Sequence, residues 1–378
     1  MKKTILLLVS VCLALFANAQ VTKTINVPTA GTLYKYLSST ERTTVTDLTI
    51  TGTIDARDFK TMRDSMLVLS VLDIKDVVIA PYTGKINEVY STQTFDANTL
   101  PNSAFFQADL LTDNTTLTSI SLPTTTVAIG TFAFFNCKAL KTIFISKLIT
   151  SIAPEVFWAC SAVITVDPQN PNYSSQDGVL FNKDKTTLIQ CPSSKSGAYI
   201  IPSTVNVIGY GAFSGCKLLT SLTIPASVNS IEENAFYNCT SLIAMYLKNT
   251  NPTFLVYNYY SIENSKSILY VPLGTKTIYQ TQSYGKYFYA IEETDFVGFE
   301  ELENEKIIVS PNPAKESISV YSEGKSDVLI YSLSGGLMLH TTVSHQESVS
   351  LSSLPASVYV VKVITEKATT MVQQFIKL

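Results

Sequence analysis

The stretch from Thr118 to Leu242 repeats itself, and this repeat constrains the fold more than any other feature of the chain. Four copies of 23 residues align without gaps: Thr118–Leu140, Lys141–Val163, Gly197–Leu219 and Thr220–Leu242. Each copy has Phe-x-x-Cys near its end, at Phe134 with Cys137, Phe157 with Cys160, Phe213 with Cys216, and Phe236 with Cys239. A fixed period of about 20–50 residues is typical of stacked units that cannot bury their apolar side alone. The sequence therefore predicts a solenoid.

Within each copy, apolar residues alternate with other residues over a short stretch. Ile143 and Ile145 flank Phe144, and Leu222 and Ile224 flank Thr223. This alternation predicts one short strand per copy, with one side facing the core. Together with the leucine that closes the preceding copy, it gives the Leu-x-x-Ile-x-Leu pattern of leucine-rich repeats. We expect the phenylalanines and cysteines to fill the far side of each coil, with the four phenylalanines in a single interior file.

The residues between the inward pairs are predicted to face solvent. If the register holds, they form one row on the concave strand face: Ser121, Phe144, Ile200, Thr223 and Tyr246. An exposed apolar and aromatic row has a physical reason only if something covers it. A curved face of stacked strands also suits a large partner. We therefore predict that this row is a binding site.

Two copies carry the string Ile-Pro-x-Ser/Thr-Val-x-x-Ile-x-x-x-Ala-Phe-x-x-Cys, at Ile201–Cys216 and Ile224–Cys239. This string closely resembles the BspA-like leucine-rich repeats of bacterial and protozoan surface proteins. The resemblance implies a cell-surface adhesin or protein-binding scaffold. It suggests host matrix proteins or other bacteria as partners.

The first residues, 1–19, are predicted to be a secretory signal peptide. Lys2 and Lys3 precede an apolar run from Ile5 to Ala17 that is too short to span a bilayer, and Ala17-Asn18-Ala19 fits a cleavage site. No later run is long enough to span either, so we expect no transmembrane segment after cleavage. An uncleaved N-terminal anchor is the alternative.

Residues 20–116 are predicted to form an N-terminal cap with degenerate repeats. Leu48–Ile50 and Val71–Ile74 have the pattern of strands, and Asp55–Met66 has helical periodicity. Terminal units of a solenoid differ from the others because they seal the open end of the core. The regular array with its C-terminal cap is then expected over residues 117–291.

An irregular unit, Ile164–Ser196, interrupts the repeats. Its oxygen-rich run Asp167–Tyr173 resembles a calcium loop in composition, but Pro168 and Pro171 break the alternating ligand spacing. We predict a longer repeat with a hairpin at Asp177-Gly178 or at Lys183-Asp184, and no metal.

Five cysteines remain after the predicted leader. Export to an oxidising compartment favours disulfide formation. However, four of the five cysteines occupy the same inward position in successive coils. A buried free cysteine packs as a small apolar group. We favour a ladder of reduced thiols, with bridges between neighbouring coils as the alternative. Cys191 is expected to lie off the ladder.

The region after the array is rich in tyrosine and then in acidic residues. Nine tyrosines lie between residues 246 and 289, at 246, 257, 259, 260, 270, 279, 284, 287 and 289. They either pack within a C-terminal cap or make a binding surface. The acidic run in residues 292–306 predicts a solvated linker.

Residues 307–378 have the short alternating segments of a separate, small Ig-like β-sandwich. Several features resemble the C-terminal sorting domain of type IX secretion cargo in Bacteroidetes: Pro311, Asn312 and Pro313 at the start, Tyr359 in a late strand, and Lys377 near the end. The resemblance implies recognition by the type IX machinery and a secreted or outer-membrane surface location. An ordinary adhesion-type sandwich is the alternative.

Charge and motif content exclude several functions. Without Lys2 and Lys3 the chain has 25 basic and 30 acidic residues, which gives a net charge of −5. Nucleic acid is therefore not expected as a partner. The two histidines, His340 and His345, both lie in the last domain, which leaves the body without an imidazole for catalysis or zinc. We predict no enzyme activity and no cofactor. A surface protein that binds or processes glycans is the alternative function, and a purely structural surface-layer role is a third.

Overall fold

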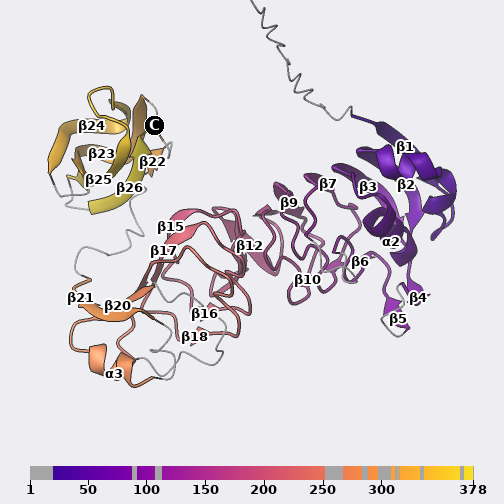
Figure 1. Cartoon of the computed structure of the whole chain (residues 1–378), viewed down its shortest axis with the longest axis horizontal. Coiled ribbons are helices and arrows are strands. Elements are labelled where there is room, and N and C mark those ends of the chain that lie inside the picture. The colour runs from indigo at the N-terminus through magenta and orange to yellow at the C-terminus, as the bar shows by residue number, and fades with distance from the viewer. Residues whose placement is uncertain are drawn as a thin grey trace, which may run out of the picture.

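The computed structural model describes residues 20–86, 92–106, 113–251, 267–282, 288–296, 308–310, 314, 316–332, 336–366 and 370–377. The described chain is mainly β: short strands stack along a solenoid, and a separate sheet follows it (Figure 1). The predicted fold class, a mainly β leucine-rich-repeat solenoid, is confirmed. The predicted signal peptide, residues 1–19, lies outside the described residues.

A first row of parallel strands begins in the N-terminal segment and continues through the repeats. Its first sheet has the order β1 (Thr22–Val27), β2 (Asp47–Ile54), β3 (Val71–Ile79) and β7 (Ser119–Ser121). Next come β9 (Thr142–Ile145) and β11 (Val163–Val166), which pair with each other. After the irregular unit, the row resumes with β15 (Gly197–Ile200), β17 (Leu219–Ile224), β19 (Ala244–Leu247), β20 (Ile268–Pro272) and β21 (Ala290–Thr294). The N-terminal cap thus shares its sheet with the first repeat.

A second row of very short strands lies on another side of each coil. One sheet of this row contains β6 (Thr99–Leu100), β8 (Ala128–Ile129) and β10 (Ser151–Ile152). The other contains β12 (Tyr173–Gln176), β13 (Val179–Asn182), β14 (Thr187–Gln190), β16 (Val207–Ile208) and β18 (Ser230–Ile231). Each regular coil therefore gives one strand to each row.

The N-terminal cap covers the open end of the core with two helices, a 3-10 turn and a hairpin. They are η1 (Leu33–Tyr36), α1 (Ser39–Thr44), α2 (Ala56–Ser65), and the pair β4 (Tyr82–Gly84) and β5 (Gln93–Phe95). The helix expected at Asp55–Met66 is confirmed as α2, with Asp55 and Met66 as its two caps.

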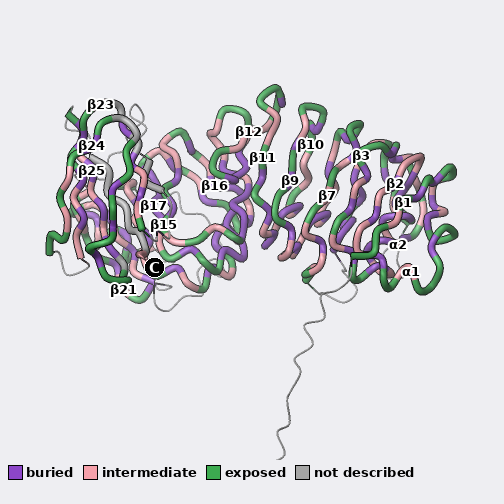
Figure 2. Tube along the Cα trace, turned by 90° about the horizontal axis from the view of Figure 1, so that it is seen from above, coloured by how far each residue is buried: buried purple, intermediate pink, exposed green. Residues whose placement is uncertain are grey.

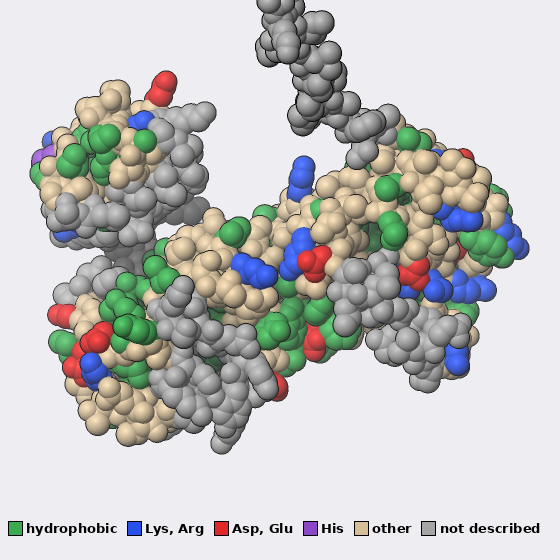
Figure 3. Space-filling model, viewed as in Figure 1, with side chains coloured by type: hydrophobic (Ala, Val, Ile, Leu, Met, Phe, Trp, Pro, Cys, Tyr) green, Lys and Arg blue, Asp and Glu red, His purple; other side chains and the backbone are tan. Residues whose placement is uncertain are grey.

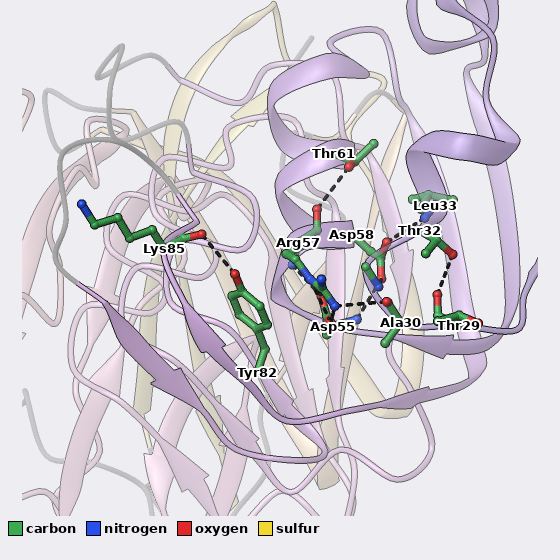
Figure 4. A network of polar contacts seen from close by, with 11 residues as sticks. Thr29, Ala30, Thr32, Leu33, Asp55, Arg57, Asp58, Thr61, Tyr82 and Lys85 are labelled. Atoms are coloured by element: carbon green, nitrogen blue, oxygen red, sulfur yellow. Dashed lines mark hydrogen bonds and ion pairs between the residues drawn. The ribbon is translucent and has the colours of Figure 1, made fainter.

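The carboxylate of Asp58 ties the start of α2 to the preceding turn (Figure 4). It is fully buried and accepts hydrogen bonds from three backbone N–H groups: Gly31 at 2.6 Å, Leu33 at 2.8 Å and Asp55 at 2.9 Å. Burial raises the pKa of Asp58, and the three N–H groups oppose this rise. The carboxylate thus satisfies donors that the cap would otherwise bury unpaired.

The apolar interior of the solenoid divides into two clusters, one on each side of the irregular unit. Figure 2 shows the buried residues along the inner side of the coils. Phe134 and Phe157 stack with ring centroids 5.6 Å apart, and Phe213 and Phe236 stack at 5.5 Å. Among the described residues, no ring contact joins Phe157 to Phe213. The single file expected from the sequence is therefore two files.

The break between the files has a clear cause in the irregular unit. β12 and β13 form an antiparallel hairpin whose turn is Asp177-Gly178, as expected. β14 then pairs in parallel with β16, so the unit adds a strand to the second row before the regular repeats resume. This extra layer lies where Phe157 and Phe213 would otherwise meet.

The five described cysteines are free and buried. Burial raises the pKa of Cys160 and of Cys239 to about 12. The thiol of Cys216 lies 3.8 Å from the carbonyl oxygen of Cys191, while the amide of Cys191 donates to Ala212. Cys191 therefore lies next to the ladder, because the irregular unit contributes its own segment to this side. Cys191 does not hold one of the Phe-x-x-Cys positions of the ladder, but it contacts the ladder through Cys216.

Each coil also turns through two residues in the left-handed conformation. The first position is held by Phe132, Glu155, Gly211 and Asn234, and the second by Asn136, Ala159, Gly215 and Asn238. Glycine and asparagine adopt this conformation most readily. Phe132, Glu155 and Ala159 adopt it at a cost in strain.

The solenoid ends in a small cap, in which α3 (Lys276–Gln280) packs Tyr279 into the core. The following domain consists of β22 (Ile308–Ser310), β23 (Ser317–Ser332), β24 (Leu337–Ser350), β25 (Ser357–Thr365) and β26 (Thr370–Lys377). β23 and β24 are longer than the short segments expected in this domain, and their pairing is interrupted by register shifts. This domain has its own apolar core.

Candidate functional site on the strand face

The outward side of the first strand row is the candidate site, and we call it the strand face. In the sheet from β15 to β21, Tyr199, Leu222 and Met245 lie in register and are buried. Because side chains alternate along a strand, the next residue of each strand points outward. The inward side chains thus fix which residues the sheet shows to solvent.

The outward row of this sheet has five members in register: Ile200, Thr223, Tyr246, Tyr270 and Glu292. Ile200 is 54% exposed, whereas Thr223 is only 8% exposed. The rings of Tyr246 and Tyr270 stack with centroids 4.7 Å apart at an angle of 13°. Burial against the neighbouring ring raises the pKa of Tyr246. The row therefore combines a stacked aromatic pair with an exposed aliphatic side chain, and Thr223 lies between them.

The outward row of the N-terminal half is mostly polar. Ser121 aligns with Asp73, and further along the same sheet Thr49 aligns with Thr24. Phe144, one repeat after Ser121, aligns with Thr165 and is 55% exposed. Phe144 is thus an isolated aromatic side chain among hydroxyl and carboxylate groups.

The structure separates the five residues expected in one row into two groups. Ser121 and Phe144 precede the irregular unit, whereas Ile200, Thr223 and Tyr246 follow it in one sheet. Sequence reasoning did not place Tyr270 in this row, because it left open whether the tyrosines of this region pack in the cap or make a binding surface. The alternation Leu269-Tyr270-Val271 repeats that of Met245-Tyr246-Leu247 and was the signal for it. Tyr257, Tyr259 and Tyr260 lie outside the described residues.

The chemistry of the strand face follows from the side chains that its strands turn outward. No group of three or more His, Cys, Asp or Glu side chains in the described part of the chain could hold a metal ion. His340 lies in the C-terminal domain, where its imidazole is 3.4 Å from the carboxylate of Asp327 on the surface. The strand face itself presents apolar, aromatic, hydroxyl and carboxylate groups.

The residues expected to carry the sorting signal are only partly described. Tyr359 is buried, and its hydroxyl donates to the carbonyl oxygen of Pro355 at 2.9 Å. Lys377 pairs with Ser357 at the end of the sheet and forms a bridge to Ala314. Pro311, Asn312 and Pro313 lie outside the described residues.

Two family models match the chain. The model of the BspA type leucine-rich repeat region matches in six copies, over residues 90–199 and 193–285. The model of the secretion system C-terminal sorting domain matches residues 308–377. Together they cover the solenoid and the separate sheet that follows it.

Several solved structures are similar to the chain. A leucine-rich repeat protein from Eubacterium ventriosum is 21% identical with a TM-score of 0.42, and the match covers 61% of this chain and 60% of that protein. The pneumococcal vaccine antigen PcpA is 14% identical with a TM-score of 0.39, over 73% of this chain and 90% of the antigen. A leucine-rich cell surface protein from Faecalibacterium prausnitzii is 19% identical with a TM-score of 0.40, over 73% and 79% of the two chains.

None of the curated proteins compared with the chain matches it. Within the described residues, no helix has the length and apolar character that crossing a membrane requires.

Proposed function

The chain belongs to the BspA-type leucine-rich-repeat family and is exported through a type IX sorting domain, and from this premise we propose that it binds a protein partner through the strand face. The partner is a surface protein of a host or of another bacterium. The proposed binding residues are Ser121, Phe144, Ile200 and Tyr246, to which we add Tyr270. Thr223, which was expected in this row as a solvent-facing residue, is left out because it is buried.

One observation carries this proposal: Tyr246 and Tyr270 stack on an outward row that also holds the exposed Ile200, with Thr223 between Ile200 and Tyr246. Tyrosine contributes a large contact area with little loss of side-chain entropy, and its hydroxyl provides a hydrogen bond. An aromatic centre with a polar surround is the usual composition of a protein interface. The polar outward row before the irregular unit, which contains Ser121 and Asp73, fits such a surround.

We further propose that binding needs no cofactor and that the protein is not an enzyme. The domain division belongs to the same proposal: a signal peptide over 1–19, a cap over 20–116, the array over 117–291, a linker over 292–306 and the sorting domain over 307–378. In this arrangement the array carries the binding site and the last domain serves export.

The test is a solid-phase binding assay with the full chain, purified host matrix proteins and whole bacterial cells. A variant with Ile200→Ser and Tyr246→Ser should bind about tenfold more weakly or worse, because central aromatic and aliphatic contacts dominate interfaces. The control is Leu273→Ser, an exposed leucine in the turn after β20. Equal binding by both variants and the native chain would refute the proposal. Circular dichroism confirms that the variants are folded.

A further inference from the structure

A second surface carries a continuous series of aromatic side chains, which we call the aromatic stripe. It lies at the turns that follow the short strands of the second row, away from the strand face. Its members are Phe106, Phe132, Phe135, Trp158, Tyr210 and Tyr237. Figure 3 shows hydrophobic side chains with an acidic side chain among them on the face below β10.

The rings of the aromatic stripe connect successive coils. The centroids of Phe106 and Phe135 are 4.5 Å apart, and those of Phe135 and Trp158 are 6.1 Å apart. Trp158 then contacts Tyr210 at 5.6 Å and Tyr237 at 5.8 Å. The stripe therefore crosses the irregular unit, at which the file of core phenylalanines is broken.

Except for Phe106, which is buried, the aromatic stripe lies outside the apolar core. Phe132, Phe135 and Trp158 are half-buried and belong to neither core cluster, while Tyr237 is 37% exposed. Each coil already fills its interior with the phenylalanine of its Phe-x-x-Cys motif. The aromatic stripe places further rings at a second position of the coils, and these rings are partly open to solvent. They therefore provide surface that a ligand can contact.

Polar groups gather at the tyrosine end of the stripe. The hydroxyl of Tyr210 accepts a hydrogen bond from the Asn234 amide at 3.1 Å and hydrogen bonds the Glu155 carboxylate. The backbone amide of Tyr210 donates to the Glu232 carboxylate at 2.8 Å. Carboxylates accept hydrogen bonds from hydroxyl groups, and the amide of asparagine both donates and accepts.

We propose that the aromatic stripe and the polar groups of Glu155, Tyr210 and Asn234 bind a neutral polysaccharide. The C–H faces of sugar rings pack on the electron-rich faces of aromatic rings. The sugar hydroxyls then donate to Glu155 and exchange hydrogen bonds with Asn234. The carboxylates of Glu155 and Glu232 repel anionic polymers, which favours an uncharged chain. This site is separate from the strand face, so it goes beyond the proposed protein binding.

Backbone strain coincides with this site. Glu155 has φ of +61° and Phe132 has φ of +59°, whereas Gly211 and Asn234 hold the equivalent positions of later coils. Glycine or asparagine would relieve the strain in the first two coils as they do in the last two. The chain instead places a carboxylate and an aromatic ring on the stripe, and strain of this kind is often found at binding sites.

Affinity electrophoresis of the full chain tests the proposal, in native gels that contain one soluble polysaccharide each. The neutral probes are dextran, amylopectin, xyloglucan and galactomannan, and the anionic probes are alginate and heparin. We expect at least one neutral probe to retard the native chain. For that probe, Tyr237→Ala should raise the dissociation constant about tenfold, since stacking on an aromatic side chain has a contribution of this order.

Tyr210→Phe is the matched variant that keeps the ring and removes the hydroxyl, and it should weaken retardation about threefold through the lost hydrogen bonds. Tyr289→Ala, which removes an exposed tyrosine elsewhere, should leave retardation unchanged. Retardation by none of the neutral probes would overturn the proposal, as would retardation by the anionic probes alone or equal retardation of Tyr237→Ala and the native chain. The protein-binding assay uses different residues, so either proposal can fail without the other.

Discussion

The indole of Trp158 lies against the ring of Tyr210 from the other side of the irregular unit, with centroids 5.6 Å apart and planes at 62°. Gly211, the residue after Tyr210, allows this approach: a Cβ atom there would be 3.2 Å from Cε3 of Trp158. The two aromatic residues belong to halves of the solenoid whose apolar clusters are separate. Their contact is therefore one of the links that couple the halves.

Trp158→Ala should reduce the free energy of unfolding by about 2–3 kcal/mol, the low end for removal of a large aromatic side chain, since the indole is only half-buried. It should also broaden or split the transition, because a solenoid is held together by contacts between neighbouring units. Urea denaturation followed by circular dichroism measures both effects. Tyr289→Ala, at a side chain that is 75% exposed, serves as the control. A transition unchanged by Trp158→Ala would show that the two halves are coupled by other contacts.

Gly215 and Gly197 form a matched pair for the close packing of the coils. Both have φ of +73°, but a Cβ atom on Gly215 would lie 2.6 Å from Cβ of Ala159, whereas nothing lies within 4 Å of the same atom on Gly197. Gly197→Ala should cost about 1 kcal/mol from backbone strain alone. Gly215→Ala should cost about 1–3 kcal/mol more from overpacking. Thermal melting of the two variants measures the difference in their stability. Equal losses of stability would mean that neighbouring coils can move apart at Ala159 at little cost.

The repeat pattern allowed much of the fold to be predicted. Strict alternation around Ile143 and Leu222 identified the inward residues, and the structure pairs these strands in parallel as a solenoid requires. The outward positions followed from the same alternation, so Phe144 and Ile200 were correctly expected on the surface. A period that fixes the inward side chains also fixes the outward ones.

The irregular unit limited the prediction of the site. Its hairpin was expected from Asp177-Gly178. No periodic signal in the sequence predicts the extra strand β14, which the irregular unit adds to the second row. The register also shifts before it: the aligned repeats place Val163 at the position of Leu140, yet Val163 pairs with Thr142 and is exposed. The turn before β11 is shorter than in the aligned copy, so β11 begins earlier in the sequence. Because apolar residues lie on both faces of β11, the sequence pattern does not reveal this shift.

The buried thiols should resist modification in the folded protein. Burial raises the pKa of Cys160 and of Cys239 to about 12 and holds that of Cys137 well above the ordinary value. The hydrogen bond with Cys191, together with burial, does the same for the pKa of Cys216, so almost no thiolate is present near neutral pH. We expect no rapid reaction of these thiols with a disulfide reagent at pH 8, followed by full reaction in guanidinium chloride. Absorbance of the released thiolate gives the count. Rapid labelling before denaturation would mean that the coils open, and absence of labelling afterwards would reveal disulfides.

The ion pair between Glu41 and Lys23 gives a pH-dependent contribution to the stability of the N-terminal cap. The ammonium of Lys23 and the backbone N–H of Ser38 both donate hydrogen bonds to the Glu41 carboxylate. These bonds, with a smaller contribution from the Ser38 side chain, lower the pKa of Glu41 from 4.5 to about 2. A carboxyl group with a lowered pKa stabilises the fold above its unfolded value and loses that contribution as the pH falls through its folded value.

Glu41→Gln should therefore be less stable than the native chain near neutral pH, and the difference between them should shrink between pH 4.5 and about 2. Because the pair is partly exposed, the difference should also shrink at high salt. Urea midpoints measured across this pH range give the comparison. Lys23→Met is the matched control, since it removes the principal cause of the lowered pKa of Glu41. The stability difference between Lys23→Met and the native chain should shrink over the same pH range, but by a smaller amount. A difference between Glu41→Gln and the native chain that stays constant from pH 7 to 2 would mean that the carboxylate contributes through packing and not through its charge.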